Sequence, residues 1–90
     1  MTMSEAVSIL RRVLNDCAYE FGSTSYQDRC TGISVGSSGD KIAVSISMYV
    51  VDRCYQEEVK NNIASTIRSI MQQYQIPYRV SYEINFTFKY

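Results

Sequence analysis

Hydrophobic residues recur along the chain with two different periods, and each change of period marks a new element. Near the N-terminus, Thr2 and Glu5 have the spacing of a capping box, which predicts a helix start. Apolar residues then recur every three or four positions, as in an amphipathic helix that ends before Gly22. Its buried face is expected to hold Met3, Ala6, Val7, Leu10, Val13, Leu14, Cys17 and Phe21.

Two strands are predicted after a polar connection at residues 23–29. The first spans residues 30–35, with Thr31, Ile33 and Val35 on one face and either a bulge or a close backbone approach expected at Gly32. Residues 36–40, GSSGD, have the composition of a hairpin loop. The second strand spans residues 41–51 and alternates strictly. Its apolar face is expected to hold Ile42, Val44, Ile46, Met48 and Val50, and its polar face Ala43, Ser45, Ser47 and Tyr49.

A second helix and a final strand complete the pattern. Asp52 is the expected N-cap, and Pro77 disfavours helix at the residue before it, so the helix is expected to run to about Tyr74. Its buried side is expected to hold Tyr55, Val59, Ile63, Ile67, Ile70, Met71 and Tyr74. The last strand is expected to carry Tyr78, Val80, Tyr82, Ile84, Phe86, Phe88 and Tyr90 on one face.

This order, α-β-β-α-β, predicts an α+β fold within a single domain, residues 1–90. We expect a two-layer sandwich with both helices on one face of a three-stranded sheet. The pattern leaves open whether the last strand pairs with the first or the second.

The final strand is long for so small a domain. Residues 78–90 extend to ~43 Å, whereas a compact domain of this length is about 30 Å wide. The end of the strand would therefore bend or fray, pair with a partner strand, or pack into a neighbouring subunit. The predicted partner-binding residues are Tyr82, Ile84, Phe86, Phe88 and Tyr90, together with Tyr49 on the polar side of the second strand.

Composition narrows the expected partners. Nine basic and nine acidic residues cancel, so we expect neither nucleic acid nor a membrane surface as partner. The eight tyrosines, of which Tyr19 and Tyr26 fall outside the predicted core, favour protein contacts. Three widely spaced cysteines and no signal peptide fit the cytoplasm, or a virus or phage particle assembled there.

Candidate chemistry is sparse. The chain contains no histidine, which removes the commonest general base and metal ligand. Cys54 falls in the first turn of the predicted second helix, where a helix dipole lowers a thiol pKa, but no partner residue accompanies it. Glu57 and Glu58 lie at the start of the predicted second helix, where the helix dipole favours acidic side chains, so a structural role explains them. We therefore expect no catalytic, cofactor-binding or metal-binding residues.

The chain resembles three groups of known proteins. The run IAVSISMYVVDRCYQEEVKNNIASTIRSIM resembles the strand-to-helix segment of alkaline-shock-like proteins, and the α-β-β-α-β order resembles the ring-building domains of secretion and sporulation machines. The resemblances to alkaline-shock-like proteins and to ring-building domains both imply a self-associating or docking module. The segment IRSIMQQYQIPYRVSYEINFTF is similar to the end of ribosome-binding factor A, a KH-like protein, but lacks that family's helix glycine. The sequence GSSG at residues 36–39 matches the GxxG of KH domains but joins two predicted strands, not two helices.

The leading hypothesis is a non-enzymatic assembly module that oligomerises or docks on a protein through its final strand, in a ring complex or a phage particle. A KH-like protein bound to RNA or the ribosome is the second hypothesis, and a small inhibitor or adaptor of one host protein is the third.

Overall fold

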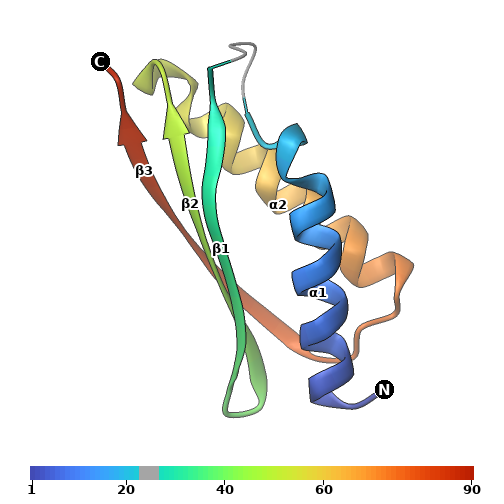
Figure 1. Cartoon of the computed structure of the whole chain (residues 1–90). Helices are drawn as coiled ribbons and strands as arrows, with labels where there is room; N and C mark the ends of the chain where they lie inside the picture. The colour runs from blue at the N-terminus through green and yellow to red at the C-terminus, as the bar shows by residue number, and fades with distance from the viewer. Residues whose placement is uncertain (23–26) are drawn as a thin grey trace.

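The computed structural model, which describes residues 1–22 and 27–90, has the predicted element order and the predicted helix-and-sheet layers (Figure 1). The helices are α1 (Met3–Cys17) and α2 (Gln56–Gln73), and the strands are β1 (Arg29–Ser38), β2 (Lys41–Val50) and β3 (Arg79–Phe88). Short 3-10 turns follow α1 (Ala18–Glu20) and precede α2 (Arg53–Tyr55).

The capping box at the start of α1 is confirmed. The Thr2 hydroxyl accepts from the Glu5 backbone N–H at 3.1 Å, and the Glu5 carboxylate accepts from the Thr2 N–H at 3.3 Å. The α-helix ends at Cys17, earlier than predicted, and the 3-10 turn carries the chain on to Phe21, which is fully buried.

Gly22 is required by a close approach of the chain. A Cβ at this position would lie 2.9 Å from the Cβ of Asp28, so any larger residue would push the start of β1 away. Asn62 of α2 donates its amide to the carbonyls of Phe21 and Gly22, at 3.4 and 3.1 Å. The segment after α1 is therefore held from both sides.

The β1–β2 hairpin is longer than predicted, because residues 36–38 continue the antiparallel ladder instead of forming a loop. Only Gly39 and Asp40 form the turn, and Gly39 has a φ of 66°, which glycine adopts without steric cost. The predicted bulge is present between Cys30 and Gly32. It turns Thr31 outward, so the expectation that Thr31 shares a face with the core residues of β1 is wrong.

The last strand pairs with the second. β3 lies parallel to β2, in unbroken register from Lys41 opposite Arg79 to Val50 opposite Phe88. The sheet order is therefore β1-β2-β3, with β2 in the centre and α2 as the crossover between the two parallel strands.

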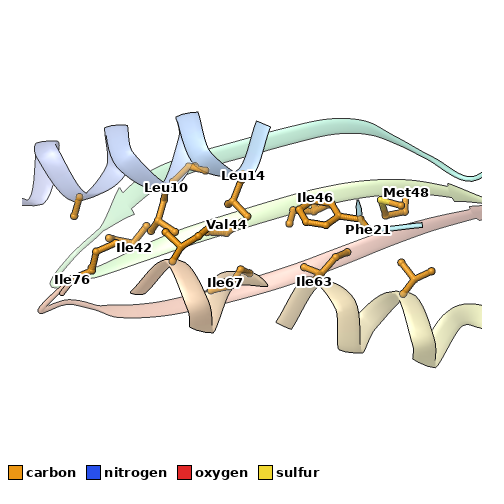
Figure 2. Close-up of a cluster of buried hydrophobic side chains, with 14 of the residues drawn as sticks. Leu10, Leu14, Phe21, Ile42, Val44, Ile46, Met48, Ile63, Ile67 and Ile76 are labelled. Carbon is orange, nitrogen blue, oxygen red and sulfur yellow. The ribbon is translucent and has the colours of Figure 1, made fainter. Parts of the chain in front are cut away.

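One hydrophobic core lies between the helices and the sheet. Figure 2 shows the buried side chains lying between the two helices and the sheet, and Figure 1 shows both helices on the same face of the sheet. The buried residues are Ala6, Leu10, Leu14, Phe21, Val35, Ile42, Val44, Ile46, Met48, Val50, Val59, Ile63, Ile67, Ile70 and Ile76. Tyr55, expected on the buried side of α2, is instead 36% exposed because it lies in the 3-10 turn before the helix.

The molecule is elongated, with principal extents of 42 × 22 × 18 Å. The expectation of a domain only about 30 Å wide is therefore wrong. All three strands have ten residues, so β2 pairs with β3 along its whole length. Phe86 and Phe88 are half-buried against the core, and no part of β3 extends past the sheet.

Candidate functional site

The outer side of β3 is a free strand edge, and its hydrogen-bonding groups can be assigned. The Lys89 N–H donates to the Val50 carbonyl at 3.2 Å, which fixes the parity of the parallel ladder up to Lys89; past this residue the Tyr90 N–H donates to the Val51 carbonyl at 3.2 Å, and the alternation ends. Odd-numbered residues of β3 therefore direct their N–H and C=O groups to β2, and even-numbered residues direct theirs away from the sheet. The edge-facing residues are Val80, Tyr82, Ile84, Phe86 and Phe88.

Two other hydrogen bonds agree with this parity. The Val51 N–H, which the opposite parity would direct to β3, donates instead to the Asp28 carboxylate at 2.9 Å. At the opposite edge of the sheet, the Val35 carbonyl points away from β2 and accepts from the Arg11 guanidinium at 2.7 Å. Val44, which is paired with Val35, therefore directs its backbone N–H and C=O groups to β3. Even-numbered residues of β2 thus bond to odd-numbered residues of β3.

The two edges of the sheet differ in their protection. The edge of β1 is interrupted by the bulge at Thr31, and its outward Val35 carbonyl already accepts a hydrogen bond from the Arg11 guanidinium. β3 has no register shift and no proline, and no described side chain bonds to its outward backbone groups. Long, regular edges of this kind are the usual place for another strand to add.

The residues of β3 whose backbone groups face the edge have apolar side chains that the helices cover incompletely. Ile84, Phe86 and Phe88 are half-buried against the core, whereas Tyr82 is 45% exposed. The Phe86 and Phe88 rings stack with centroids 5.5 Å apart, and the Arg53 guanidinium lies 4.7 Å from the Phe88 ring centroid. No residue of β3 is fully buried, as expected for a strand with one free side.

A groove of about 450 Å³ lies between α2 and β3. Its lining residues are Glu57, Lys60, Asn61, Ala64, Tyr82 and Ile84. The groove opens at the same edge as the outward backbone groups of β3. An added strand would therefore meet both the β3 backbone and the exposed side of α2.

Two of the predicted partner-binding tyrosines lie apart from this edge. Tyr49 is on the opposite, open face of the sheet, where the Arg29 guanidinium lies 4.4 Å from its ring centroid. Tyr90 follows β3 and is 73% exposed, and its carbonyl accepts from Arg53 at 3.3 Å. Tyr19 is 82% exposed, as predicted, and Tyr26 lies outside the described residues.

The open face of the sheet is lined by small and polar side chains. A shallow hollow of about 480 Å³ lies there, next to a short chain of hydrogen bonds. The Asn85 amide donates to the Ser45 hydroxyl at 3.4 Å, and that hydroxyl donates to the Glu83 carboxylate at 3.3 Å. Glu83 is the one titratable side chain in this chain of hydrogen bonds, and its other members are a hydroxyl and an amide.

Cys54 does not have the environment of a reactive thiol. Partial desolvation, followed by the Asp52 carboxylate, raises its pKa, which is opposite to the lowering expected from a helix start. The reason is structural: Cys54 lies in the 3-10 turn before α2, and Asp52 accepts the Cys54 backbone N–H at 3.0 Å. Burial also raises the pKa of Cys17 and Cys30.

Within residues 1–22 and 27–90, no group of three or more His, Cys, Asp or Glu side chains is arranged to hold a metal ion. None of the described helices combines the length and hydropathy needed to cross a membrane. In comparisons with known proteins, no family model, curated protein or solved structure matches the chain.

Sequence reasoning missed the backbone of β3 and the outer stripe of α2. The stripe could have been predicted from the sequence, because its four residues are spaced i, i+4, i+7 and i+11 and so share one helix face. They are Glu57, Asn61, Ala64 and Arg68. The free edge could not have been predicted from the sequence, because it depends on which strand β3 pairs with.

Proposed function

We propose that the chain is a non-enzymatic assembly module that docks on protein through the free edge of β3, by addition of a partner strand to the sheet. The observation that carries this proposal is the free edge itself. Five outward N–H and C=O pairs lie in a regular strand, beside half-buried aromatic side chains and an open groove. Strand addition supplies backbone bonds to such an edge and covers its side chains.

The proposed role rests on backbone chemistry, so its test removes one outward N–H and leaves the ladder to β2 in place. Tyr82→Pro does this, because the Tyr82 N–H faces the free edge. Tyr82→Ala is the matched control, since it removes the same ring and keeps the N–H. The chain is purified from its native host after chemical cross-linking, and proteins bound in stoichiometric amount are identified.

We expect wild type and Tyr82→Ala to retain a protein partner, either another chain or a second copy, and Tyr82→Pro to lose it. Equal retention by both variants would overturn docking through this edge, as would the absence of any stoichiometric protein partner.

A role on RNA is the second candidate, and one feature of the open face favours it. Arg29, Lys41 and Arg79 lie on that face and Glu83 is its acidic residue within the strands. Contacts to phosphate would make affinity for single-stranded RNA fall steeply with salt, so an affinity that does not change with salt would exclude this role.

A further inference from the structure

The edge of β3 is complementary to itself. We propose that its partner is a second copy of this chain, paired antiparallel about a two-fold axis at Ile84, so that the outer stripe of α2 packs on its symmetry mate. This inference rests on the proposed docking function of β3 and adds the identity and geometry of the partner.

A two-fold axis through Ile84 aligns the two strands along their full length. Val80 then lies opposite Phe88 of the second copy, Tyr82 lies opposite Phe86, and Ile84 meets its own mate. Every edge-facing residue meets an edge-facing residue, which permits about ten backbone hydrogen bonds between the copies. This number is typical of a stable protein interface.

The same axis brings the two α2 helices together. A two-fold axis normal to the sheet keeps the helices of both copies on one side. The open groove between α2 and β3 shows that α2 leaves the outer side of β3 uncovered. Neighbouring strands lie about 4.8 Å apart, so a helix midway between β2 and β3 would lie about one strand spacing from the axis. The two copies of α2 are then about 10 Å apart, within the range of packed helices.

The exposed stripe of α2 matches its own reverse. In an antiparallel helix pair centred between Asn61 and Ala64, these two small side chains meet at the crossing. Glu57 of each copy then lies opposite Arg68 of the other, which makes two ion pairs of opposite charge across the interface. Within one copy, Glu57 has only an exposed contact with Lys60 at 3.6 Å, and Arg68 forms no ion pair with any described residue.

The middle of the helix stripe lies near the middle of the proposed strand pairing, which favours a second copy as the partner. The groove places Asn61 and Ala64 beside Tyr82 and Ile84. The midpoint of the helix stripe therefore lies near the proposed two-fold axis, and one rotation can bring together both the strands and the opposite charges of the helices. A foreign strand would use the β3 edge but would leave the stripe of α2 without a matching helix.

One pair of like charges, Arg79 and Lys89, destabilises the proposed dimer and provides a test of its register. At each end of the paired strands, Arg79 lies opposite Lys89 of the second copy on the open face. Like charges directly opposite each other weaken an antiparallel pair. Lys89→Glu would replace two repulsive pairs by two attractive ones in this register, and registers shifted along the strand would not bring residues 79 and 89 together.

The test measures the dimer dissociation constant of the purified chain by sedimentation velocity over a range of concentrations. We expect wild type to dimerise and Tyr82→Pro to remain a monomer. Glu57→Arg and Arg68→Glu should each weaken the dimer about tenfold, since each change makes two exposed like-charge pairs. The double variant Glu57→Arg/Arg68→Glu should recover wild-type affinity, and Lys89→Glu should tighten the dimer several-fold. Circular-dichroism melts of the single variants, at concentrations where each is monomeric, show whether the fold is intact.

The outcomes separate this inference from the proposed function. A wild-type chain that stays monomeric at about 0.5 mM overturns the second copy as partner, as does a double variant no tighter than the single ones. If the chain is monomeric but binds another protein through a contact that Tyr82→Pro removes, the docking function stands and the inference about the partner fails. If Tyr82→Pro changes neither dimer nor protein partner, both are wrong.

Discussion

Proline substitutions at two neighbouring positions of β3, Ser81 and Tyr82, should have unequal effects on stability. The parity of the ladder directs the N–H group of one residue to β2 and that of the other to the free edge. The Ser81 N–H faces the carbonyl of Ile42, a residue with no exposed surface, whereas the Tyr82 N–H faces the free edge. Ser81→Pro removes a ladder bond worth about 1 kcal/mol and leaves a buried carbonyl without a partner, at about 1–3 kcal/mol. The expected loss in the free energy of unfolding is about 2–4 kcal/mol relative to Ser81→Ala.

Tyr82→Pro leaves the ladder intact. Relative to Tyr82→Ala it should cost less than about 1 kcal/mol, because proline is tolerated where a strand N–H faces solvent. Each proline is compared with alanine at the same site, so the effect of proline on the unfolded chain is similar in both comparisons and cancels between them. Urea unfolding followed by circular dichroism at low protein concentration measures all four variants. Equal losses for the two prolines would show that the assigned parity is wrong, and with it the edge on which the docking proposal depends.

Three further predictions test other parts of the structure. In hydrogen exchange measured by NMR on dilute protein, the N–H groups of odd-numbered β3 residues should be protected and those of even-numbered residues should exchange fast; uniform protection would contradict a free edge. Ile63→Ala should lower the free energy of unfolding by about 2–5 kcal/mol in urea titrations, because this side chain has no exposed surface, and a loss under 1 kcal/mol would contradict its place in the core. The Cys54 backbone N–H lowers the pKa of Asp52, so the contribution of this carboxylate to stability is present above its unfolded pKa near 3.8 and is lost as the pH falls through the lower folded value. Asp52→Asn should therefore reduce stability at pH 7 more than at pH 2 and should also lower the Cys54 thiol pKa, measured as faster alkylation at neutral pH; an unchanged alkylation rate would show that Asp52 does not act on the thiol.

The sequence predicted those parts of the fold that depend on local patterns. Alternation along β2, the capping box at Thr2 and the stop before Pro77 each depend on residues within a few positions, and all three are confirmed. The bulge near Gly32 was predicted for the same reason. The predicted burial of Tyr55 was wrong, because Tyr55 lies in a 3-10 turn, whose number of residues per turn differs from that of the α-helix pattern extended through it.

Strand pairing could not be predicted, because it depends on contacts between residues far apart in the chain. The alternation of β3 is the same whether it joins β1 or β2, and it fixes the apolar face without fixing the neighbour. The candidate site depends on that neighbour. Had β3 paired with β1, the Arg11 guanidinium could not lie on the Val35 carbonyl, and β2 would have provided the free edge.

The predicted excess length of β3 failed for an instructive reason. The estimate compared an extended strand with the diameter of a sphere, but a sheet of three equally long strands is not spherical. Here the strands set a long axis of 42 Å, and the two helices cover only one face. An elongated sheet of so few strands has a large ratio of edge to core, because each long strand on its border leaves one whole side unpaired. The same length that was expected to expose the end of β3 therefore exposes its entire outer side. The reason to expect a partner thus moves from the last aromatic residues to the backbone of residues 80–88 and the stripe of α2 beside it.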